Sequence, residues 1–232
     1  LMMITIFTIA GSAVYAAEIP VSDQDQLITS SDWTEISNLQ DEMKKEEPDA
    51  TIDYDKALKV YVDCNLIKLQ TADTKKLTSA LESANYVWVI PFKMEKTYGM
   101  FTVAKGLPLS EEAKSVLTKA EQEEVKNHAG KWMITETAEH TVEPYYDILL
   151  EKREALSDCT RVVLVGSQPG MRQPVALGMD DETARIWISL GYQYPVMEKI
   201  PETQNVESGV YSFDSVAEIS DTYIEDSEVS TG

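Results

Sequence analysis

The chain has 232 residues, a formal net charge of −20 from 40 Asp and Glu against 20 Lys and Arg, and only two Cys and two His. Proteins that bind DNA, RNA or anionic membranes rely on Lys and Arg, so this charge argues against such partners. Two Cys cannot form a disulfide scaffold, and they lie too far apart in the sequence for a CxxC motif. The length fits one domain with or without extensions.

The first 17 residues, LMMITIFTIAGSAVYAA, are apolar and end in small side chains, which is typical of a secretory signal segment. The run is short for a membrane span, and acidic residues follow it, so we expect no transmembrane span in the mature chain. A buried strand or a membrane anchor is the alternative. The usual positive start is missing, because the first Lys is Lys44. We therefore predict a secreted or extracytoplasmic protein.

The negative charge is concentrated at the two ends of the chain. Residues 18–55 hold 12 acids and 2 Lys, residues 198–232 hold 9 acids and 1 Lys, and residues 56–197 hold 19 acids and 17 bases. Like charges repel and extend a chain, so this pattern indicates a folded middle between acidic extensions.

The predicted organisation is a signal segment at 1–17, an acidic N-terminal extension with one amphipathic helix at 18–52, a single α+β domain at 53–200, and an acidic, Ser-rich, largely mobile tail at 201–232.

Apolar residues at helical spacing predict three helices in the first part of the chain. They cover about 33–43, about 53–64 with Asp53 as its cap, and about 74–81. Ser110 and Thr118 are predicted to begin two short helices in tandem, and Pro144 to lead a further helix.

Strands are predicted between and after these helices. A β-branched and aromatic run at 86–92 and alternation at 98–104 predict one hairpin, and 174–179 with 184–190 predict a second. Single strands are predicted at about 131–137 and at 161–165. Together they indicate an α+β fold with an antiparallel or mixed sheet of about six strands and helices packed against it.

No catalytic or metal-binding motif has the spacing that its chemistry requires. His128 and His140 form no HExxH pattern, and Asp23-Gln24-Asp25 supplies only the first two ligands of a Ca²⁺ loop. Residues 166–170, GSQPG, lack the glycine positions of a nucleophile elbow, and no GxxxxGK or GxGxxG occurs. We therefore expect no metal and no cofactor. Paired carboxylates stay open, because they are recognised by their distance in space.

Two sets of residues are candidate sites. Cys64 and Cys159 are expected to be two separately buried thiols, with a possible disulfide that closes 94 intervening residues as the alternative if the protein is exported. Trp187, Tyr192 and Tyr194 lie on or just after the last predicted strand and could form an aromatic patch for a sugar or protein, with ordinary core packing as the alternative.

These features predict an exported, non-catalytic binding or interaction module with a protein or glycan partner at the cell surface. A hydrolase that acts on an extracellular polymer through acidic residues is the first alternative. A structural or assembly component of the cell surface is the second. Neither the ligand nor the oligomeric state follows from the sequence.

Overall fold

A computed structural model describes residues 19–140, 143–166, 168, 171, 173–191, 197–200 and 205–219. The predicted signal segment and the last part of the predicted tail lie outside these residues.

The helices are α1 (Trp33–Ile36), α2 (Gln40–Glu46), α3 (Thr74–Glu82), α4 (Glu111–Val116), α5 (Lys119–His128) and α6 (Tyr145–Glu151), and residues 213–219 are also helical. Short 3-10 turns are η1 (Asp23–Asp25), η2 (Leu27–Thr29), η3 (Ser37–Leu39), η4 (Tyr54–Lys56), η5 (Ile67–Leu69) and η6 (Met197–Lys199). The strands are β1 (Thr51–Ile52), β2 (Leu58–Val62), β3 (Asn85–Lys93), β4 (Tyr98–Lys105), β5 (Trp132–His140), β6 (Arg161–Val165), β7 (Val175–Met179), β8 (Ala184–Ser189), β9 (Asn205–Glu207) and β10 (Val210–Ser212).

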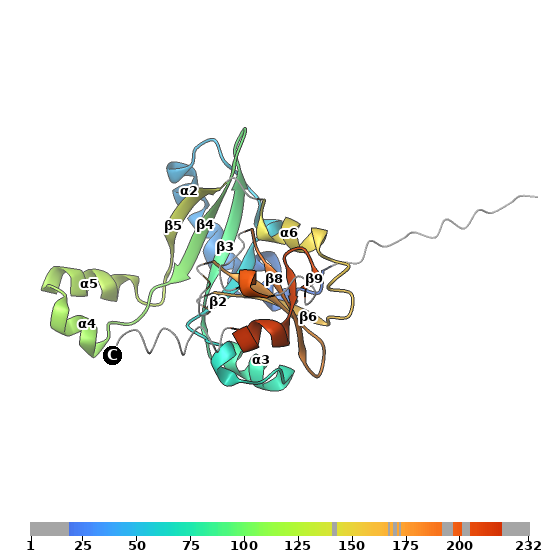
Figure 1. Ribbon diagram of the computed structural model, residues 1–232. Coiled ribbons are helices and arrows are strands. Elements are labelled where there is room, and N and C mark those ends of the chain that lie inside the picture. Colours follow the sequence, from blue (N-terminus) through green and yellow to red (C-terminus); the bar gives the residue numbers. More distant parts are fainter. Residues whose placement is uncertain are drawn as a thin grey trace, which may run out of the picture.

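All strands of the described residues join one mixed sheet (Figure 1). Its ten strands run in the order β5-β4-β3-β2-β6-β7-β8-β10-β9, with β1 beside β3. Every pair is antiparallel except β2 and β6. The predicted α+β class is therefore confirmed. The predicted number of about six strands is wrong, because β1, β2, β9 and β10 were not recognised in the sequence.

The helix predicted after Asp53 is wrong beyond its first turn. Only η4 is helical, and Leu58–Val62 is strand β2, paired with β3 and β6. The strand is covered on both faces, so apolar residues occur at both alternations and imitate the spacing of a helix.

The prediction of a largely mobile tail from residue 201 does not hold for residues 205–219. Strand β10 pairs with β8, and the helical residues 213–219 place Phe213 and Val216 in the core, 3% and 1% exposed. The apolar side chains around Val210 are few in the sequence, but they complete one end of the sheet.

Different helices pack on the two faces of the sheet. Face A carries Tyr61 and Trp88, and face B carries Val60 and Val89, because side chains alternate along a strand. On face A, α1 and α2 pack over β3 and β4, and α3 packs with residues 213–219 over β6 to β8. On face B, α6 and the segment after it cover β2 and β6 to β8.

The chain between residues 19 and 27 passes through a split in the middle of the sheet. Strands β2 and β6 pair only at Val60–Leu164 and Tyr61–Val165. Beyond that point, Val21 bridges to β6 and Gln26 bridges to β2. The N-terminal segment therefore enters on face B with Ile19 and Val21 and leaves on face A with Leu27.

A buried carboxylate lies in this split. Asp25 is 2% exposed and accepts hydrogen bonds from Tyr61 Oη at 2.7 Å, Ser22 Oγ at 2.5 Å and Arg161 Nη2 at 3.1 Å. Lys59 Nζ lies 3.9 Å from Asp25 Oδ1. Burial lowers the pKa of Lys59 although Asp25 attracts its proton. Asp25 thus joins the N-terminal segment to both central strands.

Replacing Asp25 tests this role. Asp25→Asn keeps the shape but leaves Lys59 and Arg161 without their buried anion, so we expect a loss of about 3 kcal/mol in the free energy of unfolding, measured with urea. The matched control is Asp23→Asn, an exposed acid of the same turn, with an expected change within about 0.5 kcal/mol. Equal stability of the two variants would contradict the role of Asp25.

Three tyrosines with raised pKa values predict that the folded state loses stability at alkaline pH. Burial raises the pKa of Tyr61, Tyr86 and Tyr145 above the ordinary value of 10.0, and to about 12 for Tyr145. The neutral phenols contribute fully to the stability of the folded state below pH 10. Above pH 10 the phenols of the unfolded chain ionise first, so this contribution is lost as the pH rises through the folded-state pKa. Urea unfolding should therefore show stability falling between pH 10 and 12, and Tyr145→Phe should reduce the fall. A flat profile would contradict this.

Candidate functional site

The connection between β4 and β5 is a helical projection. Residues 106–131 contain α4 and α5, which stand apart from the body of the molecule in Figure 1. Ser110 Oγ accepts a hydrogen bond from Ala113 N at 3.0 Å, and Thr118 and Glu121 form a capping box, as the sequence predicted. Neither helix has a buried residue. Capping hydrogen bonds, rather than burial of side chains in a hydrophobic core, therefore stabilise these helices.

The base of the projection is fixed at Gly106. Gly106 N donates to Lys131 O at 2.9 Å, and Gly130 N donates to Gly106 O at 2.8 Å. A Cβ at Gly106 would lie 2.1 Å from His128 O, at the end of α5. Only glycine allows this close approach of two backbone segments, so Gly106 sets the position of α5 relative to β4.

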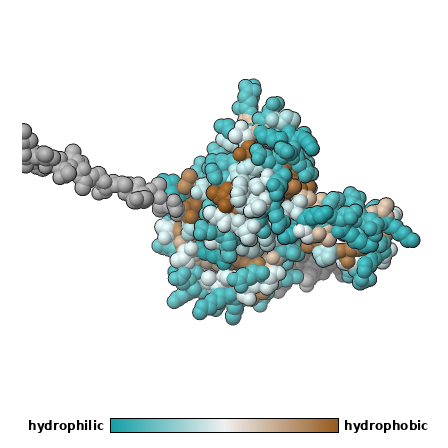
Figure 2. All heavy atoms as spheres, turned by 180° about the vertical axis from the view of Figure 1, so that it is seen from behind, coloured by the Kyte–Doolittle hydropathy of each residue, from teal (hydrophilic) through white to brown (hydrophobic). Residues whose placement is uncertain are grey.

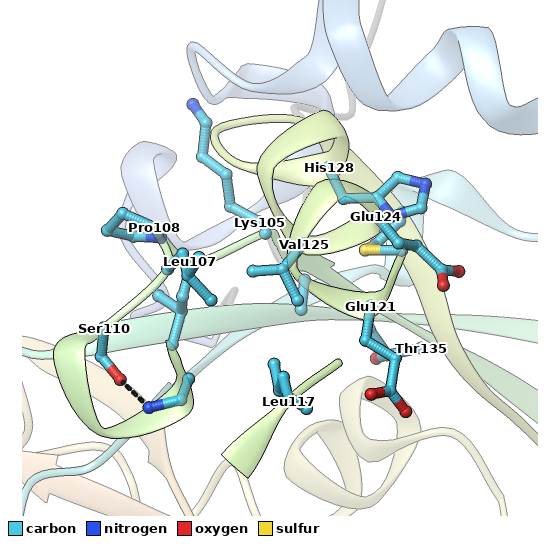
Figure 3. Close-up of a pocket in the computed structure, with 15 residues that line it drawn as sticks. Lys105, Leu107, Pro108, Ser110, Leu117, Glu121, Glu124, Val125, His128 and Thr135 are labelled. Atoms are coloured by element: carbon cyan, nitrogen blue, oxygen red, sulfur yellow. Dashed lines mark hydrogen bonds between the residues drawn. The ribbon is translucent and has the colours of Figure 1, made fainter. Parts of the chain in front are cut away.

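A groove lies between this projection and face B of the sheet. We call it the α4–α5 groove; its volume is about 720 Å³. Most of its wall is aliphatic, and the polar groups lie near its edge (Figure 3). The apolar residues lining it are Ala104, Leu107, Pro108, Leu109, Ala113, Leu117, Val125 and Met133.

Apolar side chains of the projection face solvent. Leu107, which lines the groove, is 60% exposed, and Val116, which does not line it, is 80% exposed. Figure 2, seen from behind, shows hydrophobic atoms among hydrophilic ones on this projection. Exposed apolar side chains beside a concave apolar surface are typical of a protein–protein contact site.

One edge of the groove is acidic. Glu121 and Glu124 project on the side of Thr135 and His128, opposite Ser110 and Pro108 (Figure 3). Hydrogen bonds from the Thr118 side chain and backbone lower the pKa of Glu121. Within the described residues, no lysine or arginine forms an ion pair with either carboxylate.

A second hollow continues along the same face. We call it the α6 pocket; it has a volume of about 300 Å³ and is lined by Val62, Val87, Thr102, Glu136 and Tyr145, among others. Thr102 lines the α6 pocket and Ala104 lines the α4–α5 groove, two residues apart on β4. Side chains at that separation share a face and lie about 7 Å apart. The two hollows therefore occupy neighbouring positions on face B.

The sequence did not predict the groove. Leu107 and Leu117 flank α4 and Val125 lies in α5, and nothing in the sequence shows that these side chains lack a cover. Capping is read from neighbouring residues, whereas exposure depends on which distant parts of the chain pack nearby after folding.

The predicted aromatic patch is corrected at Trp187. Its side chain is 0% exposed, and its ring stacks on Phe213 with centroids 5.8 Å apart and an interplanar angle of 7°. Trp187 is therefore a core residue and offers no surface to a ligand. Tyr192 and Tyr194 lie outside the described residues, so their part of the patch stays a prediction.

The two cysteines are placed apart. Both are free thiols: Cys64 packs on face A and Cys159 on face B, with the sheet between them. This geometry does not allow the possible disulfide without a rearrangement of the chain. Burial raises the pKa of both thiols to about 11, so neither is an activated nucleophile.

Comparisons with known proteins give no assignment. No protein-family model matches the chain, and no curated protein or solved structure matches it significantly. In the part of the chain that the structure describes, no group of three His, Cys, Asp or Glu is placed to hold a metal ion. No helix among the described residues is long and apolar enough to cross a membrane.

Gly106→Ala tests how the groove is held. The added methyl group would meet the α5 backbone, so we expect faster amide hydrogen exchange across residues 107–131 with little change in β6 to β8. Gly166→Ala is the control, because its Cβ would make ordinary contacts at 3.5 Å or more. Unchanged exchange in α4 and α5 would show that Gly106 does not set their position.

Proposed function

We propose that the protein is an exported, non-catalytic binding module whose partner docks in the α4–α5 groove. The apolar run at residues 1–17 supports export. The observation that carries the binding role is the helical projection itself, because α4 and α5 contain no buried residue and yet present aliphatic side chains around a hollow of about 720 Å³. Because these helices bury no side chain in the core, their apolar residues are available to a partner.

The chemistry of the groove favours a protein partner over a glycan. Sugars are bound by aromatic platforms, and the residues that line the groove include no Phe, Tyr or Trp. Aliphatic walls suit the side chains of a peptide segment instead. Among the partners expected from the sequence, a protein at the cell surface therefore fits best.

Two carboxylates of the described residues have structural roles rather than the role of a general acid. A general acid needs a carboxyl group with a raised pKa. The pKa of Glu121 and that of Asp180 are both lowered, by hydrogen bonds from Thr118 and from the backbone of Thr183 and Glu182, respectively. These carboxylates act as a helix cap and a turn former.

Selection from a random-peptide phage library tests the proposal. We expect peptides enriched on the purified protein to lose affinity about tenfold or more for Leu107→Asp, because a buried leucine contact is replaced by a charge. Leu107 is 60% exposed, so the fold should tolerate this change.

Val116→Asp is the matched control, because Val116 is exposed on the same projection but does not line the groove. Enriched peptides should bind this variant as they bind the original chain. Peptides that bind all three proteins equally, or a selection without enrichment, would refute the proposed function.

A further inference from the structure

We infer that the partner segment is apolar with Lys or Arg beside its apolar residues, and that it lies along face B across both the α4–α5 groove and the α6 pocket. This inference rests on the proposed function. It adds the chemistry of the partner and the path that the partner takes.

Three carboxylates define the path. Glu121 and Glu124 line the groove, and Glu136 lines the α6 pocket, next along β5 to Thr135 of the groove. We call these three residues the acidic rim. Among the described residues, none of the three pairs with a Lys or Arg. Lys105 also lines the groove, but its ammonium group lies over an indole ring, 5.4 Å from the ring centroid. An apolar floor beside carboxylates without an ion-pair partner is complementary to a segment that is apolar on one side and basic on the other.

The floor between the two hollows is made of half-buried side chains. Val62, Val87, Thr102, Ala104 and Met133 lie on face B and are neither fully buried nor fully exposed. By contrast, face A of β3 and β4 is sealed by α1 and α2, with Trp88, Phe92 and Phe101 at most 1% exposed. The uncovered part of face B thus joins the groove and the pocket into one docking surface.

Charge also argues against a second copy of this chain as the occupant. Two chains of net charge −20 repel one another. The same charge attracts a basic partner and speeds its association at low salt.

Synthetic peptides of one apolar Leu and Ala core, flanked by Lys, Gln or Glu, test the inference by fluorescence anisotropy. We expect the Lys-flanked peptide to bind most tightly and the Glu-flanked peptide least, with the difference shrinking as salt is added. Glu124→Gln and Glu136→Gln should each lower the affinity for the Lys-flanked peptide about twofold to fivefold and leave the affinity for the Gln-flanked peptide unchanged.

Glu112→Gln is the matched control, since Glu112 is exposed on α4 but does not line either hollow. Glu124→Lys should narrow the preference for the Lys-flanked over the Glu-flanked peptide more than Glu124→Gln does, because Glu121 and Glu136 stay in place. If Glu124→Gln lowers the affinity for the Lys-flanked peptide and Glu136→Gln does not, the proposed path across the α6 pocket is wrong.

The outcomes separate this inference from the proposed function. If all peptides bind equally and depend on Leu107, the groove is a binding site and the basic partner is wrong. If no peptide binds in a manner that depends on Leu107, the proposed function fails and the inference fails with it. Self-association that depends on Leu107, measured by sedimentation velocity, would replace the basic partner with a second copy.

Discussion

The structure depends on one buried carboxylate at the point where its two central strands separate. Strands β2 and β6 form the only parallel pair of the described sheet, and they share only two residue pairs. Asp25 completes the join by accepting hydrogen bonds from Tyr61 on β2 and Arg161 on β6, residues 36 and 136 positions away in the sequence. Without this anion, the two partly buried cations Lys59 and Arg161 would lie near the split without a counter-charge. The N-terminal segment is therefore a structural part of the sheet.

The same segment explains why one half of face B stays open. Residues 19–27 cross the sheet through the split, and the chain then folds over face A, where Leu27, Ile36 and Met43 pack against β3 and β4. On face B, α6 and the residues after it cover the other half of the sheet, with Leu149 and Leu156 in the core. The connection that could have covered β4 and β5, residues 106–131, instead projects away from its base at Gly106. The proposed binding surface is thus a consequence of how the chain shares its helices between the two faces.

Local signals in the sequence predicted the elements that have local causes. Ser110 and Thr118 cap helices because their side chains reach backbone groups three residues away, and β-branched runs such as Val162–Val165 specify a buried strand wherever they are placed. The rest depends on distant residues. The role of Asp25 could not be predicted from its neighbours, because Lys59 and Arg161 meet it only after folding. Strand β2 looked like a helix because it is covered on both faces, and Trp187 looked like a surface aromatic because the helical residues 213–219 that bury it lay in the predicted tail.

The central claim is that the open part of face B is the surface that binds a partner. Methyl-group NMR shifts of the purified protein, recorded while the Lys-flanked peptide is added, test it most directly. We predict that shifts concentrate on Leu107, Leu117, Val125 and Met133 of the groove and extend to Val62 and Val87, while Val163 and Leu177 on face A do not move. Shifts centred on face A, or no shifts at saturating peptide, would contradict the account.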